Sequence, residues 1–409
     1  MKIYDEIKYY TYLFTLLAAE LYSAYTFLLG KSLEEEDGMY LMLKVMVSFF
    51  SLVFLFIDYV RNNYLINIKI LIIPIFFIVC YLFDTCREAP VLEWTRKSFL
   101  FNLLYSVPPI LMASVLLYSQ KIEELYKRLD VVMLLLSLGM VASLPKMMSA
   151  GNIIEGYNNI SYQSALAFGY LYYGIFANRM DRYAFFKTYF YKLVSILLCI
   201  LLCLTSLSSG GRGGCVLLFI SMAVVSLLYM KSSNIYKVLL IFVPLSFAFS
   251  FAISYLVSDT SFASIARIGM KRAFSYVSSS GGIDIAHSGR QESYETAIRQ
   301  IQDSPIWGHG IFHTIGTTGY PHNIFLELWE SGGLFYLGCW LVIFLSFIRK
   351  AIWLFGNKEE YSFIIPLLCY PCVMLQFSGS YLMNSVFWFF VSFFFLIHKE
   401  DFVQQNENI

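Results

Sequence analysis

Long runs of hydrophobic residues alternate with short polar connections over most of the chain. A helix that crosses a bilayer needs about 20 consecutive apolar residues, and about twelve segments reach that length. They centre on residues 9–29, 40–60, 66–83, 99–119, 131–148, 162–177, 189–207, 214–230, 237–257, 323–347, 362–377 and 380–397. The pattern predicts an all-α, polytopic membrane protein of about twelve transmembrane helices.

One polar interval interrupts these runs and divides the chain. Residues 1–257 hold the predicted spans one to nine, and residues 258–322 form a long loop in which short helices are expected. Residues 323–398 hold spans ten to twelve, and residues 399–409 form a short polar tail. Chemistry that needs polar side chains is therefore expected in the long loop and where it meets the membrane.

The distribution of lysine and arginine predicts which side the loop faces. An even number of spans puts both termini on one side, and basic residues favour the cytoplasmic side. With the termini inside, the cytoplasmic connections carry most of the basic residues. The short outside connections carry only Lys31, Arg87, Arg96, Lys97, Lys146 and Arg212. The long loop is thus predicted to lie on the periplasmic face, and the 399–409 tail in the cytoplasm.

Composition narrows the function classes. The chain is 58% hydrophobic and only 14% charged, where an average soluble domain is about a quarter charged. A net charge of +1 argues against a polycation that binds nucleic acid. The spacing of Cys369 and Cys372 suits a metal, but their surroundings are apolar and favour packing. No phosphate-binding loop, dinucleotide fingerprint or metal-ligand cluster is present in the sequence, so we expect no cofactor and no metal.

The long loop contains a predicted amphipathic helix with an arginine at its start. Ser288 and Gln291 have the spacing of a helix capping box, and residues 303–305 end the pattern. Arg290 then lies in the first turn, where backbone N–H groups and the helix dipole favour an anion. Tyr294 lies on the same face, together with three apolar positions, Ala297, Ile298 and Ile301. Arg299 is about half a turn out of phase with Arg290, so the two should not face one phosphate.

A histidine stands at the start of the tenth predicted span. His322 lies between Pro321 and Asn323 at the membrane edge, where partial desolvation can tune an imidazole towards neutral pH. His287, His309 and His313 lie elsewhere in the loop. Glu330 returns to the same helix face about 12 Å deeper, within reach of a substrate. A carboxyl group inside a span is a functional candidate, although Glu330 next to two glycines also fits a local pairing role.

A glycine-rich connection, residues 208–214, surrounds Arg212 between spans seven and eight. Such backbone can expose N–H groups to an anion, and the arginine can add a bidentate phosphate contact. The alternative is a tight helical hairpin with a snorkelling arginine. Arg212 is predicted to lie on the same side of the membrane as Arg290 and His322, which favours a shared site.

Three stretches resemble the O-antigen ligase and O-antigen polymerase (Wzy/WaaL) superfamily. They are Leu204 to Gly214, Ser288 to Gly310, and His322 to Gly333. The resemblance implies a fold related to the integral-membrane, GT-C-like glycosyltransferases and a glycan donor linked to undecaprenyl diphosphate. It further implies that Arg212 and Arg290 hold the diphosphate and that His322 is the general base.

The resulting functional prediction is an inverting, metal-independent O-antigen polymerase in the bacterial inner membrane. Its catalytic candidates are His322 and Glu330, and its substrate-binding candidates are Arg212, Arg290, Tyr294, Arg299 and Asn323. The predicted partners are the lipid-linked oligosaccharide donor and acceptor and, through the family, a Wzz-type chain-length regulator. Two alternatives remain: a ligase that transfers the glycan to lipid A-core, and a lipid-linked oligosaccharide flippase or other transporter.

Overall fold

The computed structural model is all-helical where it describes the chain. It describes residues 2–29, 37–62, 68–87, 92–119, 121–150, 156–177, 182–230, 290–312, 320–357 and 361–397. The α-helices are α1 (Lys2–Leu16), α2 (Ala18–Leu28), α3 (Asp37–Asn62), α4 (Ile72–Arg87), α5 (Leu92–Tyr118), α6 (Ile122–Ala150), α7 (Tyr157–Phe176), α8 (Tyr189–Ser209), α9 (Arg212–Met230), α12 (Gln291–Asp303), α14 (Ile324–Asn357), α15 (Ile364–Phe377) and α16 (Ser385–Leu396). Three short 3-10 helices join them: η2 (Ile68–Leu71), η3 (Ala184–Lys187) and η6 (Tyr381–Met383).

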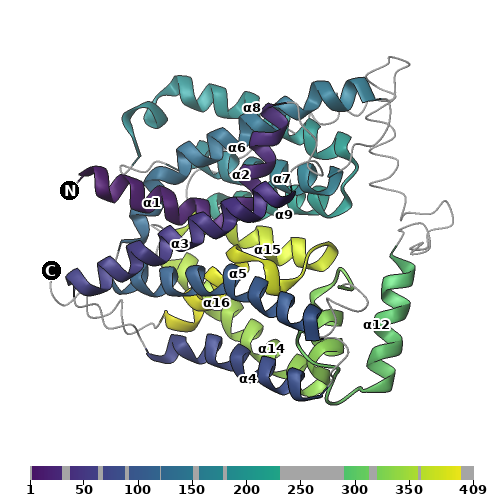
Figure 1. Ribbon diagram of the computed structural model, residues 1–409. Helices are drawn as coiled ribbons and strands as arrows, with labels where there is room; N and C mark the ends of the chain where they lie inside the picture. Colours follow the sequence, from purple (N-terminus) through teal and green to yellow (C-terminus); the bar gives the residue numbers. More distant parts are fainter. Residues whose placement is uncertain are drawn as a thin grey trace.

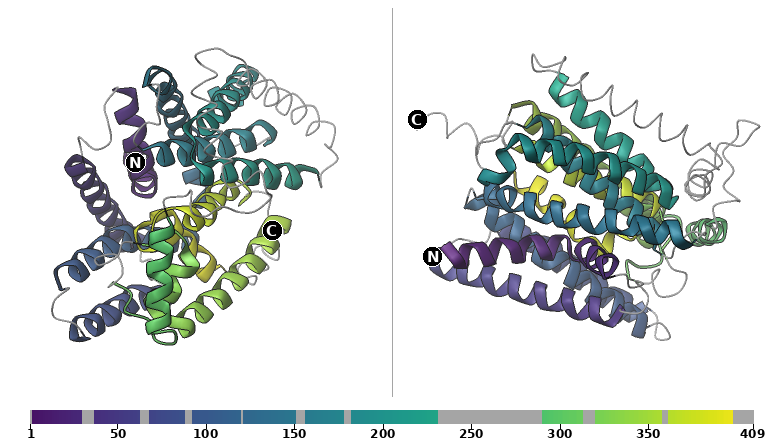
Figure 2. Two further views of the ribbon diagram at one scale, coloured as in Figure 1. Left: turned by 90° about the vertical axis from the view of Figure 1, so that its right-hand side faces the viewer. Right: turned by 90° about the horizontal axis from the view of Figure 1, so that it is seen from above.

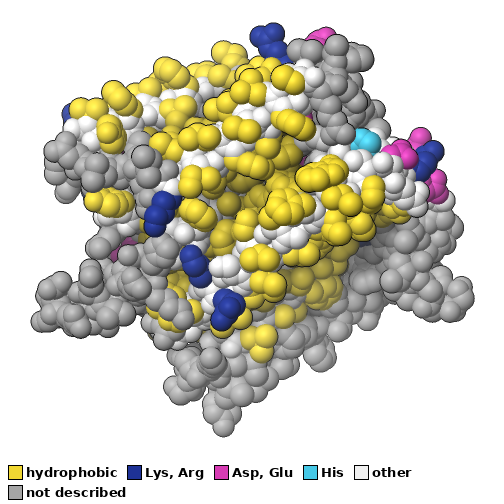
Figure 3. Space-filling model, turned by 90° about the horizontal axis from the view of Figure 1, so that it is seen from below, with side chains coloured by type: hydrophobic (Ala, Val, Ile, Leu, Met, Phe, Trp, Pro, Cys, Tyr) yellow, Lys and Arg dark blue, Asp and Glu magenta, His cyan; other side chains and the backbone are white. Residues whose placement is uncertain are grey.

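The long helices run side by side, and α12 lies across one end of them (Figures 1 and 2). Within the described residues, seven helices are long and apolar enough to cross a membrane: α3, α4 with η2, α5, α6, α8, α9 and α14. Two shorter apolar helices, α15 and α16, accompany them. A broad apolar surface covers the face seen from below (Figure 3). The multi-pass architecture is thus confirmed, whereas the count of twelve spans stays a prediction.

Three of the predicted spans differ from the structure. The first is broken at Leu17 into α1 and α2. The sixth corresponds to α7, which is not among the seven apolar spans because polar residues interrupt its sequence. The tenth is predicted to end near residue 347 but extends to Asn357 as part of α14. The ninth predicted span, residues 237–257, lies outside the described residues. Most of the long loop and the whole of the 399–409 tail also lie outside them.

Helix α7 is the centre of the larger of two helix groups. Every residue from Ile160 to Ile175 is buried, because α6, α8, α9 and α15 pack around it. Side chains that face other helices need not be apolar, which explains the serines and glutamine in this segment. The second group packs α4, α5, α14 and α16 around an aromatic core that includes Phe77, Phe312 and Trp388.

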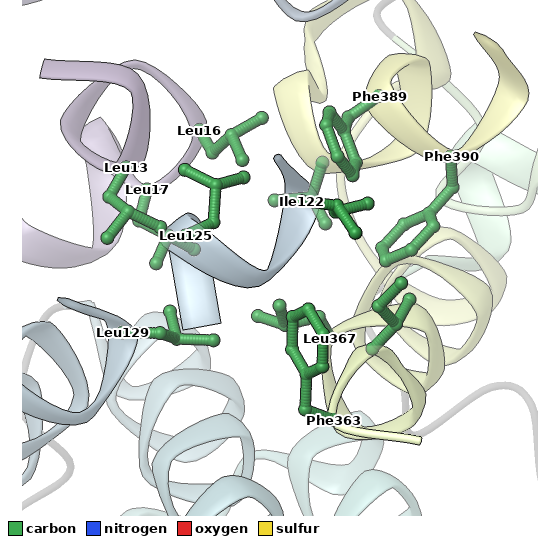
Figure 4. A pocket seen from close by; sticks show the side chains of 12 residues that line it. Leu13, Leu16, Leu17, Ile122, Leu125, Leu129, Phe363, Leu367, Phe389 and Phe390 are labelled. Atoms are coloured by element: carbon green, nitrogen blue, oxygen red, sulfur yellow. The ribbon is translucent and has the colours of Figure 1, made fainter. Parts of the chain in front are cut away.

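Helices α1 and α6 meet α15 and α16 around a small apolar cavity of about 20 Å³ (Figure 4). Leucine, isoleucine, valine and phenylalanine side chains line it, including Leu13, Leu125 and Phe390. A cavity of this size without polar groups is a packing gap rather than a place for chemistry. The functional site must be sought elsewhere.

Candidate functional site

The α8–α9 connection is a tight helical hairpin packed on α7. Gly210 ends α8 in the left-handed conformation, with a φ of 80°, and Arg212 begins α9. The Ser161 hydroxyl of α7 donates to the carbonyl oxygens of Ser206 (3.0 Å) and Gly211 (2.8 Å). The glycines therefore have a packing role, as the hairpin alternative predicted. Arg212 itself is partly exposed at the start of α9.

Glycine is required where α9 begins because α7 approaches its backbone closely. A Cβ atom at Gly214 would overlap with Ser161, and one at Gly213 would overlap with the Tyr162 hydroxyl. The phenol group of Tyr162 thus rests directly on the first turn of α9, one residue after Arg212. The first turn of a helix presents backbone N–H groups without intrahelical acceptors, which favours an anion.

Arg290 lies at the N-terminus of α12. It is the N-cap residue, with a φ of −109° and no side-chain cap, so the predicted capping box is wrong in its position. Ser288, its expected first member, lies outside the described residues. The helix ends at Asp303, as predicted, with Ala297 and Ile301 buried. Ile298 was expected on the same face but is 46% exposed, because α12 buries only a narrow stripe.

His322 lies in the turn that precedes α14, in a conformation rare for a residue with a side chain. Its φ is 54°, in the left-handed region, which suggests a function that maintains it. Its ring packs edge-on against that of Tyr320, with 4.5 Å between the ring centroids. Its Nδ1 atom is buried, and no described residue supplies a hydrogen-bond partner for that atom.

Arg290 lies within electrostatic range of His322. Burial, together with the nearby Arg290 guanidinium, lowers the pKa of His322 below its ordinary value of 6.5. The imidazole is therefore neutral at pH 7 and able to accept a proton. Arg290 also lies within electrostatic range of Tyr320 and Tyr162, and Tyr294 lies within range of Tyr162. Residues of α7 and of the turn before α14 thus lie within electrostatic range of Arg290 at the start of α12.

Two other predicted residues have visible structural roles. The Asn323 side-chain oxygen accepts from the N–H groups of Phe325 (3.0 Å) and Leu326 (3.2 Å), so Asn323 caps the start of α14. Arg299 is exposed, and its guanidinium donates to Glu295 and Thr296 of its own helix. The substrate contacts predicted for Asn323 and Arg299 stay predictions.

The two buried carboxyl groups of α14 differ in their surroundings. Glu327 accepts from the Ser380 hydroxyl and from the N–H group of Tyr381 (3.4 Å), so it fastens α14 to the segment before α16. Burial raises the pKa of Tyr320, and the nearby Glu327 carboxyl group raises it further. Glu330 is buried two residues before the glycine pair, and its catalytic role stays a prediction.

The segment after α12 forms backbone hydrogen bonds with α14 at a break in that helix. Gly333 has a φ of 71°, which interrupts the helix and leaves the Glu330 carbonyl without its usual partner, the Leu334 N–H. The His309 N–H donates to Glu330 instead (3.0 Å), and the Leu334 N–H donates to the Pro305 carbonyl (2.9 Å). The backbone carbonyl of Glu330 therefore pairs with the segment after α12, and the role of its carboxyl group stays a prediction.

Replacing Gly333 by alanine should destabilise this junction by about 2 kcal/mol or more. A Cβ atom there would overlap with the backbone of Ile306 and Trp307, and the left-handed φ adds strain. Thermal unfolding in detergent measures the effect. Gly338→Ala is the matched control, because a Cβ atom at Gly338 in the same helix meets open space. Equal melting temperatures for the two variants would contradict the docked junction.

Sequence reasoning missed Tyr162 and Tyr320. Both lie within electrostatic range of Arg290, but Tyr162 stands at the edge of a predicted span and Tyr320 in the predicted long loop. A usable signal existed for Tyr162, since the stretch Tyr157 to Ser164 is polar where a lipid-facing helix would be apolar.

Comparison with known proteins agrees with the resemblance noted above. Residues 196–341 match the model of the O-antigen ligase family, Wzy_C. Members of this family transfer lipid-linked glycans. The matched stretch contains every predicted site residue and the break in α14. No curated protein and no solved structure matches the chain.

Proposed function

We propose that this chain is a glycosyltransferase of the O-antigen polymerase type. It transfers a growing glycan from undecaprenyl diphosphate to a hydroxyl group of a lipid-linked repeat unit. The observation that carries the proposal is that Arg290, at a helix N-terminus, lies within electrostatic range of a neutral and partly buried His322. The match of the surrounding stretch to the O-antigen ligase family supports the reaction class.

The proposed reaction uses these groups directly. Arg212 and Arg290 bind the diphosphate of the donor and stabilise the charge that develops as the sugar–phosphate bond breaks. His322 accepts the proton of the acceptor hydroxyl as its oxygen bonds to the anomeric carbon. Attack opposite the leaving group inverts the anomeric configuration. Undecaprenyl diphosphate leaves with the bonding electron pair, and two guanidinium groups supply the charge that a metal ion would otherwise provide.

An apolar groove offers a place for the lipid chain of the donor. Its volume is about 280 Å³, and its lining includes Ile324, Phe325, Phe344, Leu375 and Phe387 from α14, α15 and α16. It begins two residues after His322, so a lipid seated there would place its diphosphate near the turn before α14. With the loop on the periplasmic side, as the basic residues favour, the reaction occurs at the periplasmic face of the inner membrane.

The ligase reaction is the second candidate, because the matching family carries that description. It uses the same donor, the same leaving group and the same base, and differs only in accepting lipid A-core. The described residues that surround Arg290 and His322 fit both reactions, so an acceptor test must separate them.

The lipopolysaccharide of a deletion strain provides that test. Loss of a polymerase should leave core with a single repeat unit, and the wild-type gene should restore the full ladder. Loss of a ligase should instead leave bare core with polymer retained on the lipid carrier. An unchanged ladder in the deletion strain would contradict both forms of the proposal.

A further inference from the structure

Tyr162 carries a buried hydroxyl group that the fold does not satisfy. The residue is 2% exposed, and no described residue supplies a hydrogen-bond partner for its hydroxyl. Buried polar groups in folded proteins are nearly always paired, so an exception needs an explanation. A ligand that arrives during function is one such explanation.

The neighbouring tyrosines of α7 show that this helix normally pairs its hydroxyl groups. Tyr170 donates to Asp130 (3.1 Å), and the hydroxyls of Tyr172 and Tyr173 lie 2.9 Å from those of Ser226 and Ser362. These three tyrosines are as buried as Tyr162. Among the buried tyrosines of α7, Tyr162 is thus the exception, and it is the one nearest the candidate site.

The surroundings of the Tyr162 hydroxyl favour an anion. The group occupies the space that a Cβ atom at Gly213 would take, on the first turn of α9. Arg212 precedes that glycine in the sequence, and Arg290 lies within electrostatic range of the hydroxyl. A phenol that donates a hydrogen bond therefore lies at a helix N-terminus and within electrostatic range of Arg290, and helix N-termini and arginines are usual ligands of phosphate.

We propose that the Tyr162 hydroxyl donates a hydrogen bond to a phosphate of the donor diphosphate at the N-terminus of α9. Gly213 is then needed to admit the hydroxyl to that position. This assignment rests on the proposed glycosyl transfer and adds a binding residue from the first half of the chain. It also explains why α7, which lies outside the matched stretch, packs so closely on the glycine-rich connection.

Tyr162→Phe tests the assignment because it removes one oxygen atom and keeps the shape of the ring. The measurements are initial transfer rates against the concentration of undecaprenyl-diphosphate-linked donor, inhibition by inorganic pyrophosphate, and thermal unfolding. We expect the apparent donor KM and the pyrophosphate inhibition constant each to rise about tenfold or more, since a hydrogen bond to a charged group is lost. The melting temperature should stay the same or rise, because an unsatisfied hydroxyl disappears from the unliganded protein.

Tyr172→Phe is the matched control on the same helix. It breaks the hydrogen bond to Ser226, so its melting temperature should fall while its donor KM and pyrophosphate inhibition stay at wild-type values. A Tyr162→Phe enzyme with wild-type KM and wild-type pyrophosphate inhibition would overturn the assignment, and so would one that behaves like Tyr172→Phe. If inorganic phosphate and pyrophosphate inhibit equally and both lose potency, the site binds a single phosphate group rather than the diphosphate.

Failure of this inference can be distinguished from failure of the proposed function. If transfer requires His322 and Arg290 but not the Tyr162 hydroxyl, only the assignment of Tyr162 is wrong. If the wild-type protein transfers no glycan, or transfers it equally well without His322 and Arg290, the proposed function itself is wrong.

Discussion

Replacing His322 by alanine is expected to lower the rate of glycan transfer about 10²–10⁴-fold, the usual contribution of a general base. The reason is geometric and electrostatic. His322 lies in the turn before α14 within electrostatic range of Arg290, and its lowered pKa keeps the imidazole neutral. The loss should appear in kcat measured with saturating donor and acceptor, while the expressed amount and the melting temperature stay close to wild type.

The backbone at His322 provides a control that separates chemistry from folding. Its φ of 54° is strained for histidine and at least as strained for alanine, but not for glycine. His322→Gly should therefore be as inactive as His322→Ala and yet more stable by about 1 kcal/mol. A glycine variant that is less stable than wild type would show that the imidazole holds the turn together.

The pH dependence of wild-type transfer gives a third readout for the same residue. A base whose pKa is lowered stays deprotonated as the pH falls to 6.5, and it loses activity only below that value. The acid limb of kcat/KM should thus lie below pH 6.5. An acid limb above pH 7, or one that persists unchanged in the residual activity of His322→Ala, would contradict the role of this histidine.

Replacing Arg290 by alanine is expected to reduce kcat/KM for the lipid-linked donor by about 10²-fold or more. The guanidinium is proposed to hold the leaving diphosphate, and loss of one such donor typically costs that amount. Its removal should also raise the pKa of His322, because the charge of Arg290 lowers that pKa. The acid limb of the pH profile should therefore move to higher pH in Arg290→Ala and stay nearer the wild-type position in Arg290→Lys.

Arg96→Ala serves as the matched control for Arg290. Arg96 is an exposed arginine near the start of α5, so its loss removes the same charge from a different place. Its donor kinetics and pH profile should equal those of the wild type. If Arg96→Ala and Arg290→Ala lose activity to the same extent, the effect reflects net charge rather than a diphosphate contact.

Hydrophobic patterning predicted the architecture well where spans face lipid. Helices α3, α5, α8 and α9 lie close to the predicted segments, because a lipid-facing helix must be apolar along its length. The same rule predicted α7 less well, because this helix packs against other helices on all sides and can carry serine and glutamine. It also missed the break between α1 and α2, where Leu17 gives no sign in the sequence.

The sequence predicted Arg290 and His322 as site residues because each stands at a recognisable boundary, a helix start or a predicted membrane edge. The cap that Asn323 forms on α14 is a local contact, and an asparagine directly before an apolar helical run is a usable sequence signal for it. The sequence could not show that the backbone of Glu330 pairs with the segment after α12, because that role depends on contacts between residues far apart along the chain. Tyr162 was missed for the same reason, since its place on Gly213 follows from the packing of α7 on α9.

The most direct test of the account is transfer by the purified protein in liposomes that contain the undecaprenyl-diphosphate-linked repeat unit. Formation of glycan polymer and release of undecaprenyl diphosphate are measured together for the wild type and His322→Ala. We predict one carrier released for each glycosidic bond with the wild type, and a rate about 10²–10⁴-fold lower with His322→Ala. Polymer formed at equal rates by both proteins would contradict the central claim that His322 is the base for glycosyl transfer.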